Sequence, residues 1–416
     1  MLAEIIGSDE FINDEFLNSV LSVCKSPDFA NEANAADREN KQSAKNIGLL
    51  RDIGVVREVI PFTAGGGDMG AGKLMRMMEI IGSYDGGTAT VINMNSTSLI
   101  ALSTMPRFSG LAAALSDSLE NGAMWCGGAS APSNVLDTTR AGFQFTDAGE
   151  YYIVKGRGGF CTGSETAKYY FFFGRSSDSA KKEAIIALTS LDADGLDNKR
   201  NWNALGLRAT GSHDFEAKDL RIPKENALSI PLEVMARISA ETPQDIKHFR
   251  IRPLAGIVGC QLGSARRALR ALIGHLEKRV GTIAIPVDGA DSITTVHSQN
   301  VWARHRLGRL TALLDNAQVV AHKFADDLEL HGDKGAATQY AFTRVLVATK
   351  MMLEEFQSGI TALTGAHGYV AESPLNIALR DLIGFNAMVW RLDELMVNCG
   401  SAALGETISV PGLGGT

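Results

Sequence analysis

The chain has 416 residues, of which 45% are hydrophobic and 21% charged, and its formal net charge is −7. This composition is typical of a globular protein with ample capacity for a buried core, and the acidic balance argues against a nucleic-acid partner. Five scattered cysteines without CxxC or Cys/His ligand spacing argue against a disulfide framework and against a metal site.

The sequence shows no pattern of a targeting signal. The first residues lack the basic and apolar regions of a signal peptide, and no apolar run reaches the ~18 residues that a membrane span needs. We therefore expect a cytoplasmic protein without a membrane partner.

Residues 10–120 are expected to be helical, with a glycine-rich connector at 60–67 (IPFTAGGG). A short amphipathic helix over 74–83 precedes a long apolar helix in which four polar residues are embedded. These side chains either bond the backbone and neighbouring helices or face a ligand. They are Asn93, Asn95, Ser96 and Ser98.

From residue 123 to 228 the pattern changes to period two, with β-branched and aromatic residues. A hairpin is predicted from 142–145 and 151–156. Further strands are predicted over 169–173, 183–191 and 213–222. The pattern indicates a small barrel or sandwich inserted between helical halves.

The remainder is helical. Apolar stripes at spacings of three and four predict long helices over 254–280, 310–328 and 342–360, and a final helix is predicted from Leu382 to Ala403. Four long antiparallel helices make a bundle. The predicted fold class is α+β, with an N-terminal helical domain (1–120), a middle β-barrel domain (121–230) and a C-terminal four-helix bundle (231–416).

Three motifs in this order carry a family resemblance. They are residues 202–214 (WNALGLRATGSHD) followed by 218–223 (KDLRIP), the turn at 365–369 (GAHGY), and the pair Arg380 and Asp381. Together with the helix–barrel–bundle order, they resemble the acyl-CoA dehydrogenase superfamily over nearly the whole chain. The resemblance implies the acyl-CoA dehydrogenase fold, a bound flavin and a homotetramer.

Residues 160–164 (FCTGS) are expected at a strand end, where small side chains let backbone amides approach a flat ligand. Taken alone, the same residues also suit an ST-turn that closes a hairpin, and Cys161 suits an inert core position. The resemblance implies that this strand packs against the flavin ring and that the Thr162 hydroxyl bonds flavin N5. It implies cofactor contacts at Phe160, Cys161, Thr162 and Ser164.

Other cofactor contacts follow from the resemblance alone. Residues 124–134 (MWCGGASAPSN) are similar to the first barrel loop of the family, which lies along the flavin. Arg279 is at the position of an arginine that reaches the flavin phosphates, although it also suits a surface arginine at a helix end. Trp125 also suits plain core. The implied contacts are Trp125, Ser130, Ser133, Arg279, Gly365, Gly368 and Arg380.

The catalytic carboxylate of the dehydrogenases is missing. The family places this base at one of two points, and here these are occupied by residues 388–390 (MVW) and by Ile251. A general base contributes a factor of about 10² to 10⁴. The standard dehydrogenation route is therefore not expected.

A second branch of the superfamily needs no such base. The phrases FCTGS (160–164), GGAS (127–130) and LRATGS (207–212) resemble two-component flavin monooxygenases of the dibenzothiophene monooxygenase type. The resemblance implies that an NAD(P)H-dependent flavin reductase supplies reduced flavin. Oxygen then forms C4a-hydroperoxyflavin, which oxygenates an S, N or C centre of a small organic substrate. The implied substrate pocket excludes water and comprises Asn93, Phe385, Val389 and Trp390.

The sequence departs from this branch where some members carry pocket histidines, since residues 387–390 and 93–96 contain none. The candidates for the catalytic proton donor are therefore Thr162, Ser96 and Asn95. Ala362 stands where the dehydrogenases have a glutamine that helps to hold the FAD adenosine, so we expect reduced FMN, with FAD as the alternative.

Two other functions stay open at this point. One is an FAD-dependent acyl-CoA dehydrogenase or oxidase with a relocated base, for which Asp393 and Glu394 are candidates, although they also suit a solvated helix face. The other is a non-catalytic scaffold with the same fold.

Overall fold

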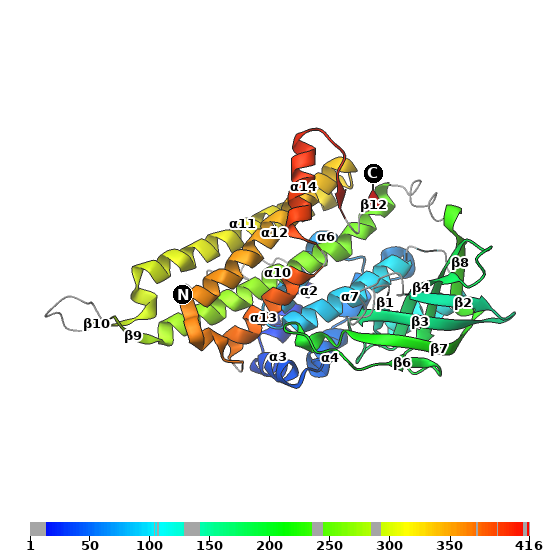
Figure 1. The fold of residues 1–416 in the computed structure, drawn as a ribbon, viewed down its shortest axis with the longest axis horizontal. Helices are drawn as coiled ribbons and strands as arrows, with labels where there is room; N and C mark the ends of the chain where they lie inside the picture. Colours follow the sequence, from blue (N-terminus) through cyan, green and yellow to red (C-terminus); the bar gives the residue numbers. More distant parts are fainter. Residues whose placement is uncertain are drawn as a thin grey trace.

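The computed structural model describes residues 14–103, 105, 108–128, 142–234, 244–283, 293–371, 373–388, 390–410 and 414–415. Over these residues, the main β-sheet comes from the middle of the chain, and the segments before and after it are mostly helical (Figure 1). The sheet lies at one end of an elongated molecule, and the long helices run away from it.

The N-terminal part is helical, as predicted. The buried helix α7 (Gly86–Ser103) begins at Asp85, whose carboxylate accepts a hydrogen bond from the Thr88 backbone N–H at 3.0 Å. Because α7 is buried on nearly all sides, its polar side chains need partners within the protein. The other helices are α2 (Glu15–Cys24), α3 (Pro27–Glu39), α4 (Ala44–Asp52), α5 (Val55–Val59), α6 (Ala71–Gly82) and α8 (Ser109–Asn121).

The sheet follows the order β6-β7-β3-β2-β4-β5-β8, with β1 beside β4. The predicted hairpin is confirmed, since β2 and β3 pair antiparallel with Phe145 opposite Val154. No pairing joins β6 to β8 among the described strands. The strands are β1 (Trp125–Gly128), β2 (Gly142–Asp147), β3 (Tyr151–Cys161), β4 (Tyr169–Ser176), β5 (Glu183–Ser190), β6 (Leu196–Asn198), β7 (His213–Pro223) and β8 (Ala227–Pro231).

An aromatic ladder fills the interior of the sheet. The Tyr170 ring stacks on Phe172 and Phe215, with centroids 5.1 and 4.6 Å apart, and Phe172 stacks on Phe145 at 5.6 Å. These rings alternate along their strands, so one face of each strand supplies a core separate from that of the helices.

The three long apolar stripes lie on three helices that run side by side in Figure 1. In each helix the stripe is buried, and α11 and α12 expose their opposite faces, whereas most of α10 is buried all round. The helices are α10 (Gln244–Lys278), α11 (Val301–His331) and α12 (Ala336–Thr364). A two-stranded hairpin, β9 (Val280–Ile283) and β10 (Ile293–Val296), joins α10 to α11 at the end of the bundle far from the sheet.

The predicted final helix from Leu382 to Ala403 is wrong in one respect, because it is two helices. These are α13 (Pro374–Ala387) and α14 (Leu392–Ala403). The break has a physical cause in the buried ammonium group of Lys350 on α12. It donates to the carbonyl oxygens of Phe385, Asn386 and Met388 at 3.0, 2.7 and 2.9 Å, and so occupies acceptors that a continuing helix would use.

Within the described part of the chain, no helix has the length and apolar character needed to cross a membrane. The same residues contain no group of three or more histidine, cysteine, aspartate or glutamate side chains placed to hold a metal ion.

Candidate functional site

The end of β3 carries a bulge that reorients its last residues. Pairing with β7 shifts register between Gly158 and Cys161, and Phe160 adopts a left-handed backbone with φ of 54°. The half-exposed Phe160 ring lies edge-on to Trp202, with centroids 6.0 Å apart. Cys161 therefore points into the sheet core, where burial raises its pKa to about 12, so its thiol is an inert core group.

Thr162 begins a chain of buried hydroxyl groups. Its Oγ1 lies 2.8 Å from Ser212 Oγ, which lies 2.7 Å from Thr210 Oγ1. The Thr210 hydroxyl donates to the Leu207 carbonyl oxygen at 2.9 Å. Thr162 is 8% exposed, so it is the member of this chain nearest to solvent.

Ser164 is tied to the same loop. Its hydroxyl donates to the Gly211 carbonyl oxygen at 2.7 Å, and the residue is buried. Residues 160–164 and 207–212 therefore form one hydrogen-bonded unit, although more than 40 residues separate them in the sequence.

Helix α7 and strand β1 close this corner, which we call the β3 corner (Thr162, Gly163, Val91, Asn95 and Cys126). Gly163 has φ of 92°, and a Cβ added to it would lie 3.6 Å from Val91 Cγ1 and 3.9 Å from Cys126 Cβ. Asn95 lies one helical turn beyond Val91. Its Nδ2 is buried with no hydrogen-bond partner among the described residues.

The polar residues of α7 mainly bond the protein itself. Asn93 Nδ2 donates to the Pro253 carbonyl oxygen on α10 at 3.2 Å, and the Ser96 hydroxyl donates to the Ile92 carbonyl oxygen at 2.7 Å. Asn95 Oδ1 accepts from the Trp125 backbone N–H at 2.8 Å, which leaves only its Nδ2 for a ligand. The sequence left open whether Ser96 and Asn93 bond the protein or face a ligand. In the structure both donate to backbone carbonyl oxygens.

Trp125 is a core residue. It is 1% exposed, and its indole N–H donates to Ser118 Oγ at 2.7 Å. Its backbone N–H is also taken, since it donates to Asn95 Oδ1. Ser130, Ser133 and Val389 lie outside the described residues.

Arg380, one of the expected cofactor contacts, has several protein partners. It forms a two-pronged ion pair with Asp37, at 3.2 and 2.6 Å, and donates to Asn376 Oδ1 and the Leu205 carbonyl oxygen at 2.8 and 3.0 Å. Four contacts on a guanidinium with five N–H groups leave little capacity for a phosphate. Arg380 instead fastens α13 to α3 and to the loop before β7.

The neighbouring residue, Asp381, binds the backbone of Leu207, the residue whose carbonyl oxygen accepts the last bond of the hydroxyl chain. Asp381 Oδ1 accepts from the Leu207 backbone N–H at 2.8 Å, and Oδ2 lies 3.3 Å from Arg267. Burial raises the pKa of Asp381 to about 6, against the opposing effects of Arg267 and the Leu207 bond. Two of the three motifs that carry the family resemblance therefore contact each other at Leu207.

Gln42 and Glu165, which the sequence did not indicate as site residues, form hydrogen bonds to the segment that ends at His213. His213 Nδ1 accepts from the Trp202 backbone N–H at 2.9 Å, so the imidazole proton resides on Nε2 and points at Glu165, 2.8 Å away. Glu165 also accepts from the Gln42 backbone N–H at 2.8 Å, which joins the loop to the N-terminal helices. Neither Gln42 nor Glu165 stands in a pattern that a single sequence would single out.

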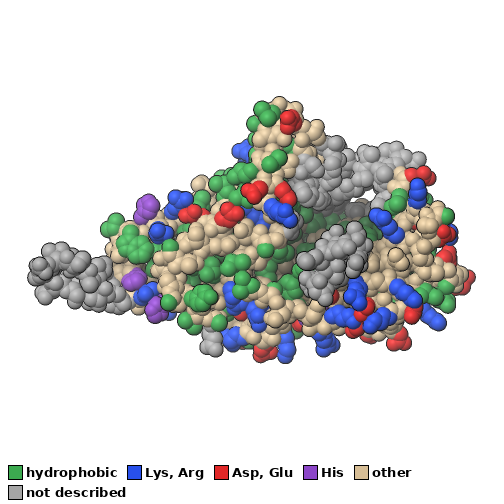
Figure 2. Space-filling view, viewed as in Figure 1, with side chains coloured by type: hydrophobic (Ala, Val, Ile, Leu, Met, Phe, Trp, Pro, Cys, Tyr) green, Lys and Arg blue, Asp and Glu red, His purple; other side chains and the backbone are tan. Residues whose placement is uncertain are grey.

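The predicted apolar pocket residues are buried. Phe385 and Trp390 belong to the core of the helical part, and Trp390 meets the Phe342 ring edge-on at 6.1 Å. Ile251, at a position where dehydrogenases place the base, is 2% exposed and the adjoining Arg252 pairs with Asp68 at 2.7 Å. Figure 2 shows a hollow in the molecular surface between the helical bundle and the sheet.

Arg279, Gly365 and Gly368 lie at the opposite end of the bundle, beside the β9–β10 hairpin (Figure 1). Arg279 donates to the Thr364 carbonyl oxygen at 2.9 Å, at the end of α12. Burial, with the Arg279 charge, lowers the pKa of the neighbouring His275. The structure therefore does not bring these three residues together with Thr162 within one chain.

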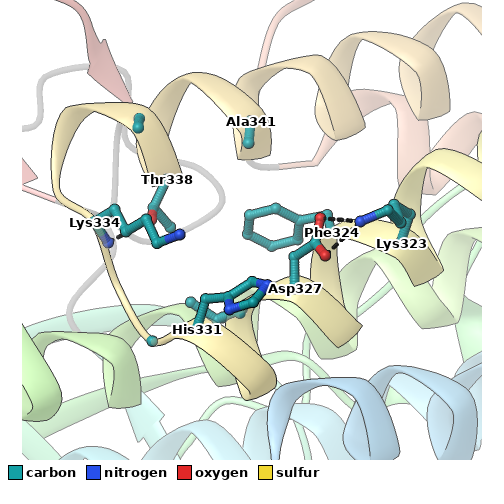
Figure 3. Close-up of a pocket in the computed structure, with 10 residues that line it drawn as sticks. Lys323, Phe324, Asp327, His331, Lys334, Thr338 and Ala341 are labelled. Carbon is teal, nitrogen blue, oxygen red and sulfur yellow. Dashed lines mark hydrogen bonds and ion pairs between the residues drawn. The ribbon is translucent and has the colours of Figure 1, made fainter.

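A separate cavity of about 370 Å³ lies at the turn between α11 and α12. Figure 3 shows Phe324, Asp327 and His331 facing Lys334 and Thr338 across it. The Lys323 ammonium pairs with the Asp327 carboxylate at its rim. No predicted site residue lines this cavity.

Aromatic rings separate this cavity from the loop between α13 and α14. Phe324 packs against Phe342 with centroids 5.2 Å apart, and Phe342 packs against Trp390. Phe342 therefore lies between Trp390 and Phe324, which lines the cavity.

Proteins of known structure share this architecture. The FMN-bound structure of TdsC from Paenibacillus sp. A11-2 matches with a TM-score of 0.81 at 15% identity, over 96% of this chain and 99% of TdsC. Residues 255–386 match the family model for the C-terminal domain of acyl-CoA dehydrogenases. The chain has the acyl-CoA dehydrogenase fold. The predicted fold class is thus confirmed.

The relatives found by sequence include both acyl-CoA dehydrogenases and monooxygenases. The mitochondrial short-chain specific acyl-CoA dehydrogenase of Mus musculus is 25% identical over 257 residues, which are 62% of this chain and 57% of that protein. Dibenzothiophene monooxygenase of Rhodococcus qingshengii is 26% identical over 222 residues, which are 51% of this chain and 50% of that protein. The chain spans about half the length of the curated relatives it matches.

Proposed function

We propose that this protein is a flavin-dependent monooxygenase that uses reduced flavin and O2 to oxygenate a small organic substrate. The observation that carries the proposal is the apolar character of both base positions, Ile251 and residues 388–390. Without a carboxylate there, neither position offers a base to remove a proton from an acyl thioester. The fold shared with TdsC, a dibenzothiophene monooxygenase solved with FMN, supports the same proposal.

The β3 corner fits a flavin by its donor and acceptor chemistry. Asn95 Nδ2 is a buried amide donor without a partner among the described residues, and such a group is costly unless a ligand or water satisfies it. A pyrimidine edge with carbonyl oxygens would satisfy it. Gly163 keeps the backbone open beside Thr162, where a flat ring would lie.

When bound, the flavin supplies the activation of O2 and the transfer of one oxygen atom. The chain's own residues hold the ring and keep water away from it. Of the three predicted proton donors, Ser96 already gives its proton to the Ile92 carbonyl oxygen. Asn95 retains an uncommitted amide N–H, but an amide does not release a proton near neutral pH. We therefore assign Asn95 a hydrogen-bonding role.

The partners follow from the same proposal. A chain that consumes reduced flavin requires an NAD(P)H-dependent flavin reductase to supply it, and the FMN of TdsC favours FMN over FAD. Because Arg279 lies at the far end of the bundle from Thr162, a contact between Arg279 and a flavin phosphate requires a second copy of the chain. This placement supports a homo-oligomer, and a homotetramer is our proposal.

The direct test supplies photoreduced FMN to the purified protein and then admits ¹⁸O2 with indole or dibenzothiophene as the probe substrate. One ¹⁸O atom per product molecule is expected. If the protein binds reduced FMN but no ¹⁸O enters either probe or a wider panel of sulfur, nitrogen and carbon compounds, the proposal is wrong.

An acyl-CoA dehydrogenase or oxidase is the second candidate, favoured by the similarity to the mouse enzyme. Against it, the candidate relocated bases Asp393 and Glu394 are exposed in the first turn of α14. Anaerobic addition of butyryl-CoA to the FAD-loaded protein separates the two candidates, because a dehydrogenase bleaches the oxidised flavin absorbance and a monooxygenase does not.

A further inference from the structure

We propose that the buried hydroxyl chain behind Thr162 makes this residue a hydrogen-bond acceptor, and that Ser212 thereby selects reduced over oxidised flavin. The inference rests on the proposed function and on the contact that the family resemblance implies, in which the Thr162 hydroxyl would face flavin N5. It adds a specificity-determining role for Ser212 and Thr210, which do not themselves touch the ring.

The direction of the chain follows from counting protons. Each hydroxyl has one, and a carbonyl oxygen can only accept. Thr210 gives its proton to the Leu207 carbonyl oxygen, so Ser212 must donate to Thr210 for their 2.7 Å contact to be a hydrogen bond. Ser212 has then used its proton, so Thr162 must donate across the 2.8 Å contact. Thr162 is left with lone pairs only.

The surroundings oppose reversal of this direction. Ser212 and Thr210 are almost completely buried, so neither has water as an alternative partner. The Leu207 peptide, which receives the last proton, is held by the bond from its N–H to Asp381. The Thr210 peptide is held as well, because its carbonyl oxygen accepts from Gln42 Nε2 at 3.0 Å.

The consequence depends on the oxidation state of the ligand. Flavin N5 carries a proton when the ring is reduced and only a lone pair when it is oxidised. Reduced flavin can therefore donate to Thr162, whereas oxidised flavin would place one lone pair against another. A single neutral hydrogen bond corresponds to a preference of about tenfold in Kd.

The experiment measures the Kd of reduced and oxidised FMN under anaerobic conditions for the wild type and two variants. The wild type should bind reduced FMN about tenfold more tightly, which raises the two-electron potential of bound FMN by about 30 mV. In Ser212→Ala the Thr162 proton is no longer committed and can turn to N5. Oxidised FMN should then bind more tightly, and the ratio of the two Kd values should approach one.

Thr162→Val removes the acceptor as well as the donor, so reduced FMN should bind more weakly while oxidised FMN changes little. The matched control is Ser177→Ala, which removes one hydroxyl from an exposed pair with Thr146 at 2.9 Å in the same sheet. It should leave both Kd values unchanged.

Two outcomes would overturn the inference. If the wild type binds both forms of FMN equally, or if Ser212→Ala weakens both by the same factor, the hydroxyl direction does not select the redox state. Either result leaves the proposed monooxygenase intact, because ¹⁸O incorporation is measured separately. Failure to bind either form would overturn both proposals and favour a non-catalytic scaffold.

Discussion

Lys350 Nζ lies 2.7 Å from the carbonyl oxygen of Asn386, at the end of α13. The ammonium group makes two further bonds, to the carbonyl oxygens of Phe385 and Met388, and is 1% exposed. Burial lowers the pKa of Lys350 to about 8, against the opposing charge of Glu354, so the ammonium group is still mostly charged at neutral pH. This one side chain sets where α13 ends and holds the loop that leads to Trp390.

Lys350→Met keeps the length and apolar stem of the side chain but leaves three carbonyl oxygens without their donor. We expect a loss of about 3 kcal/mol, or about 3 °C in the apparent melting temperature. The control Lys323→Met removes an exposed lysine that pairs with Asp327 within α11, and should cost less than about 0.5 kcal/mol. Equal melting temperatures for the two variants would show that the Lys350 bonds do not stabilise this loop.

The lowered pKa of the buried Glu79 carboxylate predicts how the stability of the protein changes in acid. Burial alone would raise its pKa, but Arg266 at 2.6 Å, His322 at 2.7 Å and Gln318 outweigh it and lower the pKa to about 2. A lowered carboxylate pKa contributes stability above the unfolded value near 4.5 that is lost as pH falls toward 2. Glu79→Gln should therefore flatten the decline in melting temperature over this range.

At neutral pH the same variant should be less stable by roughly 3–5 kcal/mol, because Arg266 then lacks its buried counter-charge. Glu355→Gln is the matched control, since Glu355 pairs with Arg309 on exposed surfaces of α11 and α12. If Glu79→Gln and Glu355→Gln have the same acid profile, the lowered pKa of Glu79 is not the cause of acid sensitivity.

Asp381 predicts the opposite pH dependence. Its folded-state pKa of about 6 lies above the ordinary value of 3.8, so the folded state binds more protons than the unfolded state between these values. Stability from this group is therefore present below about pH 4 and is lost as pH rises through 6. Asp381→Asn should remove this part of the profile while keeping an oxygen that can accept from Leu207 N–H. Melting curves from pH 4 to 7 check it.

The cysteines predict a simple labelling pattern. Cys24, Cys126, Cys161 and Cys260 are buried, whereas Cys399 on α14 is partly exposed. Burial raises the pKa of Cys260 well above its usual range and that of Cys161 to about 12, so neither forms a thiolate at pH 8. Iodoacetamide should modify Cys399 alone in the folded protein. Mass spectrometry of tryptic peptides checks this, and rapid modification of Cys161 would contradict its placement in the sheet core.

Local patterns were sufficient for much of the fold. The stripe of Leu310, Leu314 and Leu328 specifies α11 because a helix places residues three and four apart on one face. Period two across residues 142–156 specifies the β2–β3 hairpin for the corresponding reason in a strand. Both signals depend only on neighbours in the sequence.

Contacts between distant segments were decided by the tertiary structure. The break between α13 and α14 depends on Lys350, which is 36 residues from Asn386, and periodicity carries no record of it. Arg380 shows the same limit, since its partner Asp37 is 343 residues away and a motif match could not show that its guanidinium was already occupied.

The sequence by itself determined the order of helices and strands, the apolar residues at both base positions, and the presence of a hydroxyl at Thr162. Only the tertiary structure decided which other hydroxyls are linked to it by hydrogen bonds. The reason is that Ser212, Thr210 and Leu207 meet Thr162 across about 50 residues of chain, and hydrogen-bond direction is a property of the whole buried set.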